Sequence, residues 1–154
     1  MSDDRRDRLS IAGRRLPAAF ARREVVIAPG DERPYDPSEW RDALVIVKRG
    51  EYGALLFSGG GAFAIPGLPL EEVRDPTGAG DSFAGGFLGY LDGVRVRREH
   101  DDRALRQAMA YGSVMASFNV EDFGTTRLGE LQATEVAERL AEFKRLTHFE
   151  AQPA

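Results

Sequence analysis

The segment 75–83, DPTGAGDSF, combines residues whose types and spacing suit the chemistry of a bound anion. Its two glycines allow backbone angles and close approaches that a side chain would prevent. They directly precede a run with helical spacing, and the first amides of a helix lack acceptors and lie at the positive end of its dipole. The segment therefore predicts an anion hole made of four successive amides, those of Gly78, Ala79, Gly80 and Asp81.

Asp81 adds a carboxylate to this anion hole. A carboxylate beside a phosphoryl group can accept the proton of an attacking hydroxyl, while fixed amide dipoles stabilise the charge of the transition state. We therefore interpret Asp81 as a candidate catalytic base. A structural alternative exists, because an Asp near a helix start often serves only as a cap. The length of the run favours the functional interpretation.

Strands and turns that would position this motif lie before it in the chain. Apolar segments predict strands at 43–47, 54–57 and 62–66, and a further short strand at 25–28. The run at 43–47 is continuously apolar, which is typical of a strand buried on both faces. The glycines at 59–61 separate two strands that are close in sequence. We therefore interpret them as a mobile surface turn rather than as a nucleotide loop.

Three helices are predicted from the motif onwards. Amphipathic spacing places them at about 79–91, 102–118 and 134–146. The first of them contains Gly85, Gly86 and Gly89. Each glycine costs about 1 kcal/mol in a helix interior relative to alanine. Three such losses indicate that another backbone crosses this helix at close range.

Composition argues against several classes of function. The chain has 154 residues, a formal net charge of −4 and no cysteine, which disfavours a nucleic-acid surface, a disulfide framework and a cysteine-based zinc site. No apolar stretch is long enough to span a membrane, and a cytoplasmic, reduced setting is the default expectation. Residues 1–23 hold seven arginines, which we interpret as a solvated leader, with a nucleic-acid or membrane arm as the alternative.

The extended string DPTGAGDSFAGGF at 75–87 resembles the second signature of the ribokinase/PfkB family of carbohydrate kinases. The similarity continues on both sides of this string. The segment 47–56 is similar to the family's strand–turn–strand that borders ATP, and 115–124 resembles the end of the helix that lines the adenine pocket. The segment 128–149 resembles the C-terminus of bacterial sugar kinases, so that the resemblance covers about residues 42–149.

This resemblance implies an α/β fold of the ribokinase-like three-layer α/β/α type, incomplete because it covers the C-terminal half of the family fold. It divides the chain into a divergent Arg-rich leader and loop at 1–41, a PfkB-type portion at 42–149 and a tail at 150–154. The family's first half supplies a Gly-Gly sugar-binding motif, a β-sheet lid and an Asn-x-x-Glu motif, which we do not find in 1–41. We therefore expect a homodimer, or an N-terminal half supplied from elsewhere.

The resemblance also assigns roles to single residues. Asp81 matches the family's catalytic base, and the amides of 78–81 match its anion hole. ATP would be bordered by residues that match the family's nucleotide-binding positions: Lys48, Gly50, Gly53, Gly80 and Tyr111. Backbone near Asp75 and Thr77 would hold a monovalent cation such as K⁺. The implied cofactors are ATP and Mg²⁺.

The predicted function is that of an ATP-dependent sugar kinase, which transfers a phosphoryl group to a sugar hydroxyl with Asp81 as base. Two alternatives stay open: a nucleotide-binding module without catalysis, and a non-enzymatic remnant that packs against a partner. For Lys48 and Arg49, the alternative is a pair of solvated turn charges. The expected partners are ATP and a sugar or sugar-like substrate, with neither nucleic acid nor membrane.

Overall fold

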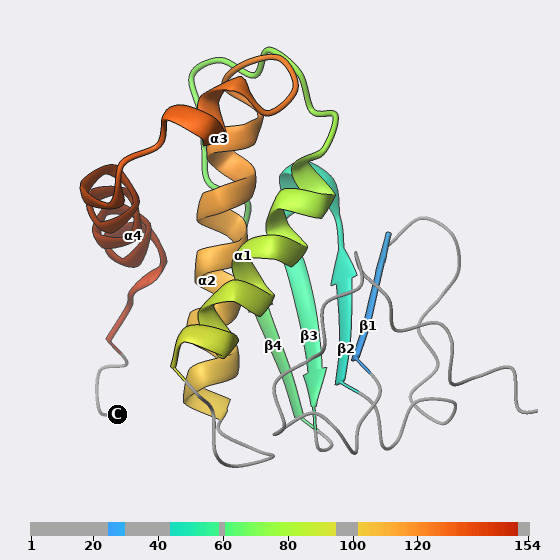
Figure 1. The fold of residues 1–154 in the computed structure, drawn as a ribbon. Coiled ribbons are helices and arrows are strands. Elements are labelled where there is room, and N and C mark those ends of the chain that lie inside the picture. Colours follow the sequence, from blue (N-terminus) through green and yellow to red (C-terminus); the bar gives the residue numbers. More distant parts are fainter. Residues whose placement is uncertain (1–24, 30–43, 59–60, 95–101, 151–154) are drawn as a thin grey trace, which may run out of the picture.

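The computed structural model describes residues 25–29, 44–58, 61–94 and 102–150 (Figure 1). One sheet contains the four strands of these ranges in sequence order: β1 (Val25–Pro29), β2 (Leu44–Lys48), β3 (Ala54–Ser58) and β4 (Gly61–Ile65). β1 and β2 are parallel, whereas β2, β3 and β4 are joined as antiparallel neighbours. The four predicted strands are confirmed to within one residue at each end. The predicted leader at 1–23 and the glycines 59–60 lie outside the described residues.

The described part of the chain also contains four α-helices: α1 (Ala79–Gly93), α2 (Asp102–Asn119), α3 (Thr126–Glu130) and α4 (Ala133–Thr147). The three predicted helices are confirmed with ends that shift by two residues at most. The single-turn α3 was not predicted, because so short a segment shows no helical periodicity. Among the helices described, none has both the length and the apolar character that crossing a membrane requires.

β2 is buried on both faces, as its continuous apolar run predicts. Leu44 and Val45 are each 3% exposed and Ile46 is fully buried. Side chains alternate along a strand, so Leu44 and Ile46 point to one face and Val45 to the other. Leu44 and Ile46 belong to the main core together with residues of the helices. β2 is therefore the central support of the structure that carries the site.

α1 and α2 lie antiparallel over this core face of the sheet, and α4 packs against α2 on the side away from the sheet (Figure 1). Large side chains from all three helices fill the core: Phe83, Phe87, Leu91, Met109, Phe118 and Phe143. The predicted α/β class is confirmed. In the described residues the helices cover one face of the sheet, which corresponds to one of the two helical layers of the predicted three-layer fold.

The predicted close backbone crossing occurs at one of the three glycines of α1. A methyl group placed at Gly86 would lie 2.9 Å from the carbonyl oxygen of Tyr111 and 2.8 Å from Met115 Cγ in α2. At Gly85 and Gly89 nothing lies within 4 Å, so the prediction was wrong for these two residues. Of the three glycines of α1, only Gly86 lies at the crossing, and Gly112 of α2 lies there too, where a methyl group would be 2.9 Å from the Phe83 carbonyl oxygen. These two glycines let α1 and α2 approach closely.

Candidate active site

The segment 75–83 forms the start of α1, as its pattern predicts. Gly78 directly precedes the helix, and its φ of 83° lies in the left-handed region that favours glycine. No side chain donates or accepts a capping hydrogen bond at this position. α1 therefore opens with backbone groups alone, which is the arrangement that binds anions at helix starts.

The amides at this helix start differ in whether they already have an acceptor. The Ala79 N–H donates to the Pro76 carbonyl at 3.2 Å and closes a turn. Within the described part of the chain, the N–H groups of Gly78, Gly80 and Asp81 have no hydrogen-bond acceptor. Three of the four amides predicted to form the anion hole thus lack an acceptor among these residues and can bind a ligand, and the fourth shapes the turn.

Lys48, the last residue of β2, reaches this helix start. A methyl group placed at Gly80 would lie 2.5 Å from Lys48 Nζ, so the ammonium group lies directly over Gly80. A cation at the positive end of a helix dipole is unfavourable unless an anion lies beside both. Among the ion pairs of the described residues, none involves Lys48. The local charge therefore suits a bound anion.

Asp81 lies in the first turn of α1, next to Gly80, and its side chain is exposed. The structure thus brings together a cation, three amides without acceptors in the described ranges, and a carboxylate that solvent and substrates can reach. The cation and the amides can hold a phosphoryl group, and the carboxylate can accept a proton from a hydroxyl that approaches it.

Gly50 and Gly53 shape the turn between β2 and β3, directly behind Lys48. The Gly53 N–H donates to the Gly50 carbonyl at 3.1 Å, and the Arg49 N–H donates to the Gly53 carbonyl at 2.8 Å. Gly53 has a φ of 89°, and a side chain there would collide with the backbone that follows β4. The turn is therefore packed tightly, and this packing fixes the end of β2 from which Lys48 extends.

Asp75 and Thr77, predicted to hold a monovalent cation, are engaged in hydrogen bonds within the protein. The Thr77 N–H donates to Asp75 Oδ1 at 2.9 Å, and hydrogen bonding by Thr77 holds the pKa of Asp75 below its ordinary value of 3.8. The Thr77 carbonyl accepts a hydrogen bond from Asn119 Nδ2 at 2.8 Å. These contacts support a role in shaping the loop.

Tyr111 lies apart from the other predicted site residues. Its ring stacks on Tyr90 with the ring centroids 4.6 Å apart. Tyr90 follows Asp81 by nine residues on α1, which is about 13 Å along a helix axis. The structure therefore does not bring Tyr111 to the start of α1.

Asn119 was missed by the sequence prediction. It ends α2, is 2% exposed, and accepts a hydrogen bond from Ser82 Oγ at 2.9 Å in addition to donating to Thr77. An Asn at a predicted helix end resembles a C-terminal cap, so the residue type gave no signal of a role in the site. Its partners are 37 and 42 residues away in sequence, which a local pattern does not reveal.

The chain is similar in sequence to known kinases. Residues 37–131 match the pfkB family carbohydrate kinase description. A cytidine kinase from Thermococcus kodakarensis is 42% identical over 98 residues, which cover 58% of this chain and 34% of that protein. An ATP-dependent ribose-1-phosphate kinase from Halopiger xanaduensis is 37% identical over 95 residues, covering 61% of this chain and 30% of that protein. The chain thus spans about a third of the length of these curated relatives.

A solved structure has the same arrangement of elements. Fructokinase from Vibrio cholerae O395, solved with fructose, ADP and calcium ion, superposes with a TM-score of 0.66 at 22% sequence identity, over 76% of this chain and 41% of that chain. This likeness confirms the predicted ribokinase-like fold, as a partial one. The family match covers more than half of the chain. The protein therefore belongs to the pfkB family of carbohydrate kinases.

Proposed function

We propose that this chain binds ATP at the start of α1 and transfers its terminal phosphoryl group to a hydroxyl of a sugar or nucleoside. One observation carries the proposal: the Lys48 ammonium lies over Gly80 at a helix start whose amides are unpaired in the described residues, with Asp81 beside them. The relatives named as cytidine kinase and ATP-dependent ribose-1-phosphate kinase support this class of reaction.

In the proposed step, the acceptor hydroxyl oxygen forms a bond to the terminal phosphorus of ATP, and the bond from that phosphorus to the bridging oxygen breaks. The hydroxyl proton passes to the Asp81 carboxylate, and ADP leaves with the bridging oxygen. The amides of Gly78, Gly80 and Asp81 stabilise the charge on the transferred group, because they are fixed before the reaction begins.

Lys48 has a separate role in this proposal. Its ammonium neutralises charge on the phosphate oxygens next to Gly80, and it is held there by the packed β2–β3 turn. The described residues contain no group of three or more His, Cys, Asp or Glu side chains that could hold a metal ion. Mg²⁺ that enters with ATP would be held mainly by phosphate oxygens and water.

The proposal is tested in two stages with the full chain. Calorimetric titration with ATP should show binding, and replacing Lys48 by Met should weaken it by about tenfold or more, since a hydrogen bond to a charged group contributes about 1.5–3 kcal/mol. The matched control is Arg49→Met, because Arg49 is the next cation in the same turn and lies over the Tyr52 ring instead. A chain that binds no ATP would overturn the proposal.

The second stage measures ADP release with a panel of acceptors that includes cytidine, ribose 1-phosphate and fructose. Acceptor-dependent ADP release supports phosphoryl transfer. ATP binding without release of ADP for any acceptor would remove catalysis from the proposal and leave nucleotide binding, the second function that the sequence suggested.

A further inference from the structure

The end of α2 contacts the site loop on both sides of the anion hole. Asn119 Nδ2 donates to the Thr77 carbonyl at 2.8 Å, and Ser82 Oγ donates to Asn119 Oδ1 at 2.9 Å. Thr77 and Ser82 directly flank the residues 78–81 that supply the anion-hole amides. One buried carboxamide, 2% exposed, therefore holds both ends of this segment.

Two further contacts extend this connection. A methyl group placed at Gly78 would lie 3.5 Å from both Asn119 Nδ2 and Oδ1, so the carboxamide packs against the Gly78 backbone. The carbonyl of the next residue, Val120, accepts hydrogen bonds from the N–H groups of Arg74 at 2.8 Å and Asp75 at 3.4 Å. The loop thus rests on the end of α2 along most of its length.

The Thr77 carbonyl explains why the Asn119 contact bears on ligand binding. In a helix, each N–H donates to the carbonyl four residues earlier, so the Thr77 carbonyl is the acceptor that the Asp81 N–H would take if α1 began one residue sooner. Asn119 Nδ2 donates to that carbonyl, and the Asp81 N–H makes no hydrogen bond to it. The Asp81 N–H stays available to an anion.

Ser82 is affected in the same way. Serine hydroxyls near a helix start commonly bond to nearby backbone groups and so compete with ligands for them. The Ser82 hydroxyl donates to Asn119 instead, which turns it away from the amides of the anion hole. Both hydrogen bonds of Asn119 therefore have the same effect, because each leaves the amides at the start of α1 available to a ligand.

We infer that Asn119 is a positioning residue for phosphate binding, acting through Thr77 and Ser82 without touching the ligand. This inference rests on the proposed function, because it deepens the role of the same anion hole. It assigns to the end of α2 the task of preorganising the loop, so that binding does not have to break a Thr77–Asp81 hydrogen bond first.

The test compares Asn119→Leu, which removes both hydrogen bonds at similar volume, with Ser117→Ala as the matched control. Ser117 is also buried near the end of α2, but its hydroxyl donates to the Val114 carbonyl at 2.6 Å, away from the loop. Asn119→Leu should weaken ATP binding by about tenfold or more, as two net hydrogen bonds are lost. Ser117→Ala should leave ATP affinity within about twofold of the unmodified chain.

A second readout needs no ligand. In amide NMR spectra of the free protein, Asn119→Leu should shift or broaden the resonances of residues 78–82, and Ser117→Ala should leave them in place. If the unmodified chain binds no ATP, the proposed function fails, while these resonances still test the positioning. Unchanged resonances and unchanged ATP affinity in Asn119→Leu would overturn the inference.

Asn119→Asp keeps the inference testable if Asn119→Leu does not fold. The introduced carboxylate can accept from Ser82 but cannot donate to the Thr77 carbonyl, and it repels phosphate. When protonated it can do both, as the carboxamide does. The affinity deficit of this variant relative to the unmodified chain should therefore shrink as pH falls towards about 4. A deficit that is constant with pH would contradict the positioning role.

Discussion

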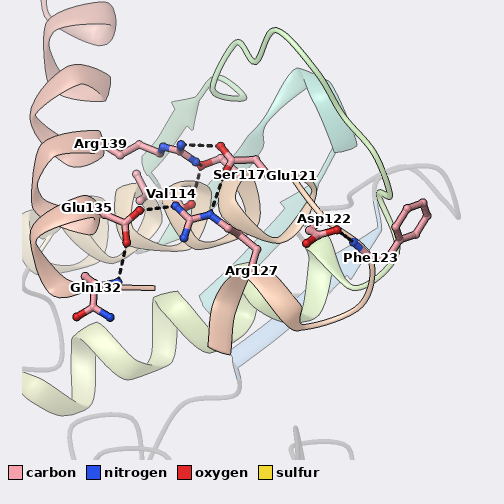
Figure 2. A network of polar contacts seen from close by, with 9 residues as sticks. All are labelled: Val114, Ser117, Glu121, Asp122, Phe123, Arg127, Gln132, Glu135 and Arg139. Carbon is pink, nitrogen blue, oxygen red and sulfur yellow. Dashed lines mark hydrogen bonds and ion pairs between the residues drawn. The ribbon is translucent and has the colours of Figure 1, made fainter. Parts of the chain in front are cut away.

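The end of α2 is connected to its neighbours on two sides by two different kinds of polar contact. Towards α1, the buried Asn119 makes two neutral hydrogen bonds that are partly buried. Towards α3 and α4, Glu121 pairs with Arg127 and Arg139 in an ionic cluster (Figure 2). The two regions begin only two residues apart in sequence, at Asn119 and Glu121. In the ionic cluster the described charges are paired, whereas the site beside Asn119 has donors without a described partner.

In the ionic cluster, every described charge has a partner. Arg127 Nη2 contacts Glu135 Oε1 at 2.5 Å and Arg127 Nε contacts Glu121 Oε2 at 3.2 Å, while Arg139 Nη2 contacts Glu121 Oε1 at 2.5 Å (Figure 2). The Arg139 guanidinium also lies 3.5 Å from the centre of the Phe118 ring. The bond to Glu135 raises the pKa of Arg127, and the same bond lowers the pKa of Glu135.

At the start of α1, in contrast, the donors have no described partner. Lys48 forms none of the described ion pairs, and the amides of Gly78, Gly80 and Asp81 lack acceptors within the described residues. Paired charges contribute to holding elements together, whereas unpaired donors that are fixed in place are available to a ligand. The comparison therefore assigns stability to the ionic cluster and ligand binding to the helix start, and the following predictions test that division.

Asp81→Asn should give the largest effect on activity. The variant keeps the size of the side chain and removes the base, so the rate of phosphoryl transfer should fall by about 10²–10⁴-fold, with ATP affinity within a few fold. The matched control is Asp122→Asn on the ionic-cluster side, where the carboxylate accepts only from the Phe123 N–H in the described residues. Steady-state ADP release measures both. Equal rates for Asp81→Asn and the unmodified chain would remove Asp81 from the mechanism.

Gly86→Ala should break the support that both regions share. The added methyl group would meet Tyr111 and Met115 of α2, and overpacking of this kind costs about 1–3 kcal/mol of unfolding free energy. Gly85→Ala adds the same group one position away, where nothing lies within 4 Å, and should stabilise the chain by up to about 1 kcal/mol. Urea unfolding of the two variants gives the difference. Equal midpoints would refute the close crossing.

The glycines of α1 show what the sequence could and could not predict about the fold. Helical spacing places Gly86 on the same side as Phe83, three residues earlier, which is buried at 5% exposure. That spacing could have identified Gly86 as the glycine at the contact between the helices. Treating the three glycines together overestimated how many of them lie at this contact. The strands and long helices were predictable from apolar periodicity because their faces are buried. α3 was not predictable from this periodicity, because none of its five residues is buried.

The site also has features that the sequence predicted and features that it did not. The local motif predicted the helix start at Gly78 and the placement of Asp81 in its first turn, because both depend on neighbouring residues. The position of Lys48 over Gly80 depends on the packing of a strand against a helix. The family resemblance predicted only that both residues border ATP. The role of Asn119 depends on a contact with a residue 42 positions away, which a single sequence does not reveal.

Arg139→Met should lower stability without affecting ligand binding. It removes the ion pair with Glu121 and the contact with the Phe118 ring, and both groups are partly exposed, so the expected loss is about 1–2 kcal/mol of unfolding free energy. Lys144→Met on the exposed side of α4 should change the free energy by about 0.5 kcal/mol or less. Calorimetry should give the same ATP affinity for both variants. A tenfold loss of affinity in Arg139→Met would show that the two regions are coupled.

The smallest expected effect is on the pH dependence of stability, through Glu135. Its pKa lies below the ordinary value of 4.5 because Arg127 and the Gln132 N–H bond to the carboxylate. The stabilisation is therefore complete above pH 4.5 and is lost as pH falls below that value through the lowered pKa of the folded state. Glu135→Gln should be less stable than the unmodified chain at pH 7, and the difference in unfolding free energy should narrow as pH falls below 4.5.

Urea midpoints of the two chains across this range measure the narrowing. Some slope should persist in Glu135→Gln, because the pKa of Asp75 is also lowered, from 3.8, by its bond with Thr77. A difference between the chains that stays constant through the acid range below pH 4.5 would show that the Glu135 charge contributes nothing to the ionic cluster. In that case the contacts of the Arg127 and Arg139 guanidinium groups with the Phe118 ring, rather than ion pairing, would hold α3 and α4 to the end of α2.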